Sequence, residues 1–163
     1  MNELDLIERR IESGRAVPRI DPVSIVHDDG ESPIAATEKA IRRLTAADYK
    51  APNIAVLSYR GLSSSIIARP TGPSTLAGIG VRRPAGYTPD GDALWTRGDL
   101  LVDTLFRFKG QAADAVVVTE SAFEAFNQKA RRRLFVALTR ARLQAALVST
   151  SRAKAAILRD LTR

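Results

Sequence analysis

Residues 103–111 combine a hydroxyl, two cationic side chains and a glycine within one short segment. Thr104 ends a predicted strand, and a turn containing Arg107, Lys109 and Gly110 follows it. Threonine hydroxyls and the backbone N–H groups around a glycine are natural phosphate ligands. A Lys-Gly turn between strands is also a common structural feature, so this segment taken alone favours phosphate binding only weakly.

Residues 131–142 form a second basic segment, with five arginines on a predicted helix. At helical spacing the apolar stripe comprises Phe126, Ala130, Leu134, Leu138 and Ala141. Arg140 lies beside small residues at the end of this helix, immediately before a predicted strand, so we expect it next to a sheet rather than in solvent. The alternative is an ordinary surface arginine.

The elements that must position these two segments alternate between strands and helices. Apolar runs predict strands over 23–27, 53–59, 99–106, 115–119 and 144–150. Periodicity predicts helices over 2–13, 32–48, 63–69, 126–142 and 151–161, the last with Ser151 as N-cap. Such alternation indicates an α/β fold with a mainly parallel central sheet. Ligands of these sheets bind at the carboxyl ends of strands, here the turns after Tyr59, Leu105 and Thr119.

Two parts of the chain differ from this pattern. Residues 70–98 are rich in glycine and proline and predict loops, with a hairpin around Pro89-Asp90-Gly91. Residues 1–20 are expected to form an N-terminal helix and linker. A length of 163 residues predicts one domain.

The positive charge is concentrated at one end of the sequence. Residues 1–128 contain 15 Lys or Arg and 17 Asp or Glu, whereas residues 129–163 contain 10 and one, which gives the net charge of +7. Such a block fits phosphate or nucleic acid as a partner about as well as it fits a solvated basic face.

Composition excludes several classes of protein. The chain has no cysteine and one histidine, which excludes a disulfide scaffold, a thiolate zinc site and a cysteine nucleophile. There is no apolar run of about 18 residues that would span a membrane. The beginning of the sequence is acidic rather than signal-like, so we expect a cytoplasmic protein.

Together the two basic segments resemble motifs V and VI of UvrD/Rep-type superfamily 1 DNA helicases. Motif V of that family looks like Thr-x-His-x-x-Lys-Gly-x-Glu before an apolar strand, and motif VI like Arg-Arg-Leu-x-Tyr-Val-Ala-x-Thr-Arg-Ala. This chain has Thr104, Lys109 and Gly110 for the first, and residues 132–141 for the second with one residue fewer after Leu134. Residues 53–60, ending in Tyr59-Arg60, are similar to motif IVa. The likeness is greatest to helicases whose motif V reads Arg-Phe-Lys-Gly-Gln, some with a nuclease-related N-terminal domain.

The resemblance implies a RecA-like domain of three layers and a role for each matched residue. Arg140 corresponds to the motif VI arginine finger, which reaches the γ-phosphate of ATP bound between two such domains. Gly110 and Gln111 are implied to lie near the nucleotide. Residues implied to contact or approach single-stranded DNA are Tyr59, Arg60, Thr104, Arg107 and Lys109.

Two departures and one absence qualify these roles. Phe106 stands where many members have His, and Ala112 where many have Glu near the ribose. The sequence has no Gly-x-x-x-x-Gly-Lys-Ser/Thr and no Asp-Glu pair after an apolar strand. In this family both belong to the first RecA-like domain. We therefore expect the second RecA-like domain, with ATP and Mg²⁺ held mainly by an N-terminal domain of the parent chain and no ATP hydrolysis by this chain alone.

Two alternatives remain open at this point. One is a degenerate helicase-like module that binds nucleic acid without a role for ATP. The other is a structural α/β domain whose basic helices dock onto a protein. Candidate stacking surfaces for bases are Tyr59, Trp95, Phe106 and Phe108, each of which also fits ordinary core or loop packing.

Overall fold

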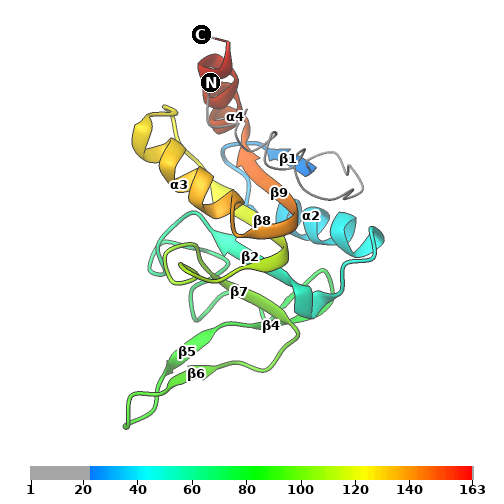
Figure 1. The fold of residues 1–163 in the computed structure, drawn as a ribbon, viewed down its shortest axis with the longest axis vertical. Helices are drawn as coiled ribbons and strands as arrows, with labels where there is room; N and C mark the ends of the chain where they lie inside the picture. Colours follow the sequence, from blue (N-terminus) through cyan, green and yellow to red (C-terminus); the bar gives the residue numbers. More distant parts are fainter. Residues whose placement is uncertain (1–22, 163) are drawn as a thin grey trace.

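The computed structural model describes residues 23–162, and its centre is a seven-stranded sheet (Figure 1). The strand order is β1-β9-β8-β2-β7-β4-β3, and every neighbouring pair is parallel except β3 with β4. The strands are β1 (Val23–His27), β2 (Ile54–Ser58), β3 (Thr75–Leu76), β4 (Ile79–Arg82), β7 (Leu100–Thr104), β8 (Ala113–Ser121) and β9 (Ala141–Thr150). The mainly parallel sheet predicted from the sequence is confirmed.

Strand β2 lies at the middle of the sheet between β8 and β7. All five of its residues are buried. The apolar run from Ile54 to Leu57 has no alternation, because helices cover both faces of the sheet and each side chain meets a core on its own side.

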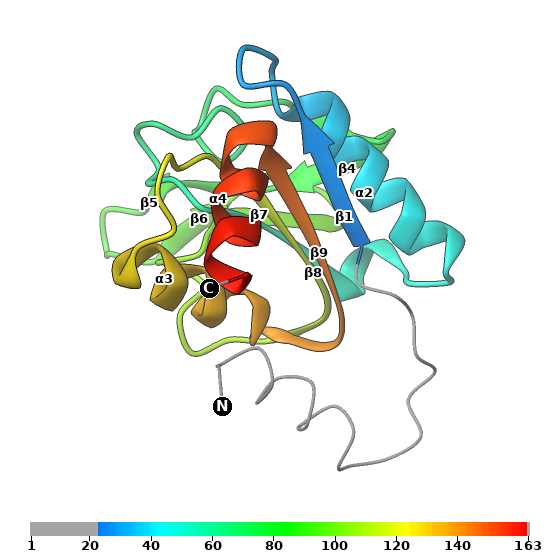
Figure 2. The ribbon, with the colours of Figure 1, turned by 90° about the horizontal axis from the view of Figure 1, so that it is seen from above.

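Within residues 23–162, three helices make the outer layers (Figure 2). Helix α2 (Ile34–Ala46) covers one face and buries Ala36, Ala40, Ile41 and Leu44 against it. Helices α3 (Gln128–Leu138) and α4 (Ser151–Leu161) lie on the opposite face, where Leu134 and Ile157 join the second apolar cluster. The sheet between these helices forms a half-barrel, so the predicted α/β RecA-like layering is confirmed.

Residues 63–69 do not form the predicted helix. They follow the short 3-10 helix η1 (Ala51–Asn53) and strand β2, and their backbone makes a series of turns. The N–H groups of Ile66 and Ile67 donate to the carboxyl group of Glu120, and the N–H of Ala68 donates to the Ser65 hydroxyl. These bonds replace the intrahelical ones, which the sequence pattern has no means of anticipating.

The C-terminal elements have boundaries that differ from those predicted. Helix α3 ends at Leu138 rather than Arg142, and β9 already begins at Ala141, opposite Ala113 of β8. The predicted N-cap of α4, Ser151, is wrong. Thr150 is the N-cap, with its side chain accepting from the Ala153 N–H at 3.1 Å.

The loop-rich segment 70–98 contains more structure than predicted. The expected hairpin is present as β5 (Pro84–Tyr87) and β6 (Ala93–Trp95), with its turn at residues 88–92. Strands β3 and β4 were not anticipated, and β4 pairs with β7 as part of the main sheet. The helix predicted over residues 2–13 lies outside the described residues.

Candidate functional site

The carboxyl ends of β2, β7 and β8 meet at one edge of the sheet, as predicted for the turns after Tyr59, Leu105 and Thr119. Two backbone hydrogen bonds continue the strand ladders past their ends. The Tyr59 N–H donates to the Thr119 carbonyl at 2.9 Å, and the Leu105 N–H donates to the Ser58 carbonyl at 3.0 Å. The turn after each strand is thereby tied to its neighbour, so this edge is a defined surface.

Thr104 holds the turn that follows β7. Its side chain is buried, and its hydroxyl oxygen accepts from the Arg107 N–H at 3.3 Å. The Phe108 N–H also donates to the Thr104 carbonyl, at 3.1 Å. Thr104 therefore organises the backbone of residues 105–108 and is itself 2% exposed.

The neighbouring residue Asp103 received no role from the sequence, yet it is a buried carboxyl group at the same edge. Its Oδ1 lies 3.2 Å from the Arg107 Nε and accepts from the Thr104 N–H at 2.7 Å. Burial raises the pKa of Asp103, and the Thr104 N–H and the Arg107 guanidinium offset part of that rise. Asp103 thus fixes the direction of the Arg107 side chain.

Tyr59 is a core residue of this edge and not an open stacking surface. It is 7% exposed, and its ring centre lies 5.7 Å from that of Phe123. Burial raises the pKa of the Tyr59 hydroxyl, while the charge of Arg133 lowers it. Arg60, the next residue, is exposed, and its N–H donates to the Ser58 hydroxyl oxygen at 3.0 Å.

Arg133 of α3, in the segment that resembles motif VI, contacts one aromatic ring from each of the segments that resemble motifs IVa and V. Its guanidinium carbon lies 5.0 Å from the ring centre of Tyr59 and 4.9 Å from that of Phe106. A guanidinium over an aromatic face is attracted by the negative potential of the ring. Phe106, which replaces the histidine common in motif V, therefore meets a cation of the motif VI segment while remaining 49% exposed.

Glu120 is a second buried acid of this edge that received no role from the sequence. It is 4% exposed and adopts a positive φ of 59°. Its carboxyl oxygens accept from the Ser58 hydroxyl at 3.1 Å, the Ser65 hydroxyl at 2.5 Å and the Ile66 N–H at 3.1 Å. The signal for it in the sequence is a single acidic residue directly after the apolar run of residues 115–119.

The candidates Gly110, Gln111 and Arg140 lie toward the opposite edge, where β8 and β9 begin. Gly110 has a positive φ of 83°, and the Gln111 N–H donates to the Phe108 carbonyl at 3.0 Å. The Ala113 N–H then donates to the Arg140 carbonyl at 3.0 Å. Residues 105–112 therefore carry the chain from the carboxyl edge of the sheet to its amino edge, where they meet Arg140.

Arg140 lies between α3 and β9 and not within the helix as predicted. Its N–H donates to the Ala137 carbonyl at 3.2 Å, a tight closing turn, and its Nε donates to the Val136 carbonyl at 3.2 Å. The side chain is partly buried, and none of the described carboxylates forms an ion pair with it. The expectation that Arg140 lies next to the sheet is confirmed.

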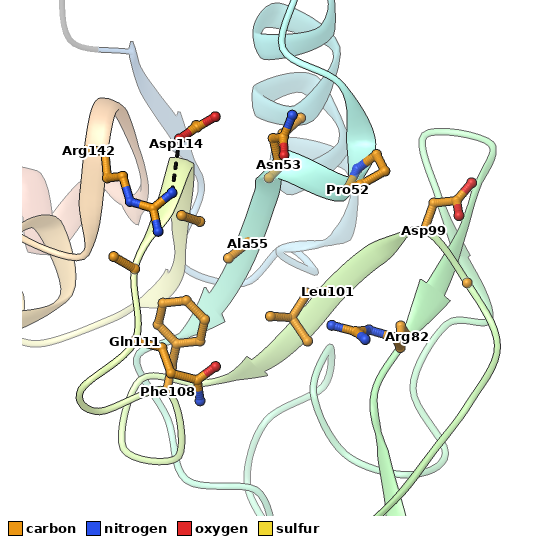
Figure 3. A pocket seen from close by; sticks show the side chains of 14 residues that line it. Pro52, Asn53, Ala55, Arg82, Asp99, Leu101, Phe108, Gln111, Asp114 and Arg142 are labelled. Atoms are coloured by element: carbon orange, nitrogen blue, oxygen red, sulfur yellow. Dashed lines mark hydrogen bonds and ion pairs between the residues drawn. The ribbon is translucent and has the colours of Figure 1, made fainter.

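A cavity of about 500 Å³ opens at the amino edge (Figure 3). Gln111, Phe108 and Leu101 line one part of it, and the ion pair between Arg142 and Asp114, at 3.2 Å, closes another. Its wall includes Gln111 but not Arg140, which lies two residues before Arg142.

Comparisons with known proteins agree with the layout of these segments. Residues 99–148 match the family model of the UvrD-like helicase C-terminal domain. This range runs from β7 into β9 and includes residues 104–112 and Arg140, which supports a C-terminal domain of the UvrD/Rep type. Tyr59, Arg60 and the β5–β6 hairpin lie outside the matched range. No curated protein matches the chain.

None of the helices in residues 23–162 is long and apolar enough to cross a membrane. The matched family consists of C-terminal domains of helicases. Membership of that kind implies an N-terminal partner domain and binding of a nucleic acid.

Proposed function

We propose that this chain is the second motor domain of an ATP-dependent DNA helicase. Arg140 would act as the arginine finger toward ATP held by a separate P-loop domain, and the carboxyl edge of the sheet would form part of a groove for single-stranded DNA. The observation that carries the proposal is the hydrogen bond from the Ala113 N–H to the Arg140 carbonyl at 3.0 Å. This bond joins the end of the segment 105–112 to Arg140 at the amino edge of the sheet. Thr104 anchors the beginning of the same segment at the carboxyl edge.

The chemistry of Arg140 supports its part in this proposal. Its Nε donates to the Val136 carbonyl, which holds the side chain in one direction. No acceptor among residues 23–162 engages its terminal N–H groups, so they are available for phosphate oxygens. A guanidinium beside the transferred phosphoryl group stabilises the charge that develops in the transition state. Gly110 and Gln111 would approach the nucleotide from the same edge. The proposal assigns the phosphate cradle and Mg²⁺ to the partner domain.

Exposed cations support the proposed contact with DNA at the carboxyl edge. Arg60, Arg107 and Lys109 are exposed and follow the ends of β2 and β7. The buried side chains of Tyr59 and Thr104 would hold the backbone that presents these cations. Binding would be independent of sequence, because phosphate contacts carry no base information.

The proposal is tested with the chain joined to the P-loop domain of its parent protein. We expect ATP hydrolysis stimulated by single-stranded DNA, reduced about 10³-fold or more by Arg140→Ala. Arg43→Ala, on an exposed position of α2, is the matched control and should leave the rate unchanged. The chain by itself should not turn over ATP. Turnover by the isolated chain that Arg140→Ala abolishes would overturn the proposal.

A degenerate module that binds nucleic acid without ATP is the second candidate. Ala112 offers no polar side chain at the position near the ribose, and the Phe106 ring is engaged by Arg133. In the joined protein, this candidate predicts no loss of ATPase for Arg140→Ala. Both candidates predict binding of single-stranded DNA that weakens with salt. The slope of the logarithm of the binding constant against the logarithm of the salt concentration should become shallower by about 0.7 for each phosphate contact removed by Arg60→Ala or Lys109→Ala. Binding without a salt slope would instead favour a protein-docking domain.

A further inference from the structure

The β5–β6 hairpin extends away from the main sheet and presents two faces (Figure 1). Tyr87 is paired with Ala93, and Trp95 lies two residues after Ala93 on the same strand. Because side chains alternate between faces along a strand, Tyr87 and Trp95 share one face of the hairpin. Leu94, paired with Gly86, lies on the other face.

The shared face carries exposed aromatic rings. Tyr87 is 63% exposed and Trp95 40% exposed. Large aromatic side chains contribute most to stability when they are buried. Two of them on one exposed face of a hairpin are therefore unusual for a surface without a ligand. Of the other candidates from the sequence, Tyr59 and Phe108 are buried and unavailable for stacking, and the exposed Phe106 ring lies against the Arg133 guanidinium.

Each exposed ring is accompanied by an arginine. The guanidinium carbon of Arg82 lies 5.4 Å from the ring centre of Trp95, and Arg82 has no ion pair among the described residues. The Arg107 Nη1 lies 3.5 Å from the Tyr87 hydroxyl oxygen. Arg107 belongs to the turn after β7, so the hairpin face is continuous with the carboxyl edge of the sheet.

We infer that the Tyr87–Trp95 face of the hairpin binds single-stranded nucleic acid. This inference rests on the proposed function and extends its groove beyond the matched segments. Flat rings accept bases by stacking, and arginines beside them neutralise the phosphates between those bases. An apolar peptide would satisfy the rings but would leave the charge of Arg82 without a counterpart. The acidic residues of the hairpin, Asp90 and Asp92, lie in its turn, so the strand portion is the binding surface.

The chain provides its own probe, because Trp95 is its single tryptophan. We expect titration of the 163-residue chain with a thymidine oligonucleotide to quench Trp95 fluorescence in step with binding measured by anisotropy of a labelled oligonucleotide. Stacking on an aromatic side chain is worth about 1–3 kcal/mol per base, so Tyr87→Ala and Trp95→Ala should each weaken binding by about 5- to 100-fold. Leu94→Ala is the matched control, since it removes an exposed apolar side chain from the opposite face.

The outcomes separate this inference from the proposed function. Binding that loses affinity with Arg60→Ala but is indifferent to Tyr87→Ala and Trp95→Ala, with unchanged Trp95 fluorescence, overturns the hairpin surface and leaves the proposed groove standing. Absence of any binding, at low salt and with folded protein by circular dichroism, overturns both. An equal loss in Leu94→Ala would mean that the hairpin fold, and not its aromatic face, is what matters, and this also overturns the inference. The same titration with an apolar peptide should leave the fluorescence unchanged.

Discussion

Glu120 and Arg83 both bind the backbone of Ile67, Glu120 at its N–H group and Arg83 at its carbonyl. The Ile67 N–H donates to Glu120 Oε1 at 3.3 Å, and the Arg83 Nη2 donates to the Ile67 carbonyl at 2.9 Å. Both side chains are buried, and Arg83 also donates to the Gly72 carbonyl at 3.2 Å. Glu120, near the end of β8, and Arg83, directly after β4, thereby fix the loop that follows β2.

Replacing Glu120 by Gln should destabilise the protein. One carboxyl oxygen becomes an NH₂ group, which cannot accept from the hydroxyl and N–H donors that surround it. Leaving such a buried donor unpaired costs about 1–3 kcal/mol, measured as the free energy of unfolding in urea. Glu124→Gln is the control, since Glu124 is exposed and its ion pair with Arg152 should contribute less than about 1 kcal/mol. Equal effects of the two substitutions would contradict the assigned role of Glu120.

The two residues should also be coupled. Once Glu120→Gln has loosened the Ile67 segment, Arg83→Met has less order left to lose, so the double variant should cost less than the sum of the single variants. Residues that share a partner show interaction energies of about 0.5–3 kcal/mol in such a cycle. Additivity within the error of the unfolding curves would mean that Glu120 and Arg83 hold separate parts of the loop.

Gly98→Ala should disrupt the attachment of β4 to β7. A Cβ at Gly98 would lie 2.4 Å from the Gly80 carbonyl oxygen and 2.6 Å from the Val81 carbonyl carbon, both of which are backbone atoms. Because backbone cannot rotate away as a side chain can, the strands must separate, at a cost of about 1–3 kcal/mol or more. Gly61→Ala serves as the comparison, since a Cβ there meets nothing within 4 Å. A urea midpoint for Gly98→Ala as high as that for Gly61→Ala would show that the strands can absorb the extra atom.

Asp103 should make stability depend on pH in a defined direction. Its pKa is raised in the folded state above the ordinary value of 3.8, chiefly by burial, so the folded protein binds its proton more tightly than the unfolded chain does. The resulting stabilisation is complete below pH 3.8 and is lost as the pH rises through the folded-state pKa. Relative to Asp103→Asn, the natural protein should therefore lose stability across this window in thermal unfolding. A difference that stays constant with pH, or that changes in the other direction, would exclude the buried Asp103 as its source.

Much of the framework could be predicted from local pattern. The uninterrupted apolar run of β2 indicated a strand buried on both faces, and the positions of Ile41 and Leu44 indicated the buried side of α2. Such patterns are local because the period of a helix or strand is expressed within a few residues. Element boundaries were less accurate, as the end of α3 shows, because a single hydrogen bond from Ala113 to Arg140 begins the next strand.

What the sequence by itself determined is the α/β class, the identity of the basic segments and the resemblance carried by residues 104–112 and 132–141. Only the tertiary structure decided that these segments reach two opposite edges of the sheet, that Glu120 and Arg83 bind one loop, and that Tyr87 and Trp95 share an exposed face. The physical reason is the same in each case. These relationships depend on hydrogen bonds and contacts between residues far apart in the chain, and their partners become defined only when the sheet has assembled.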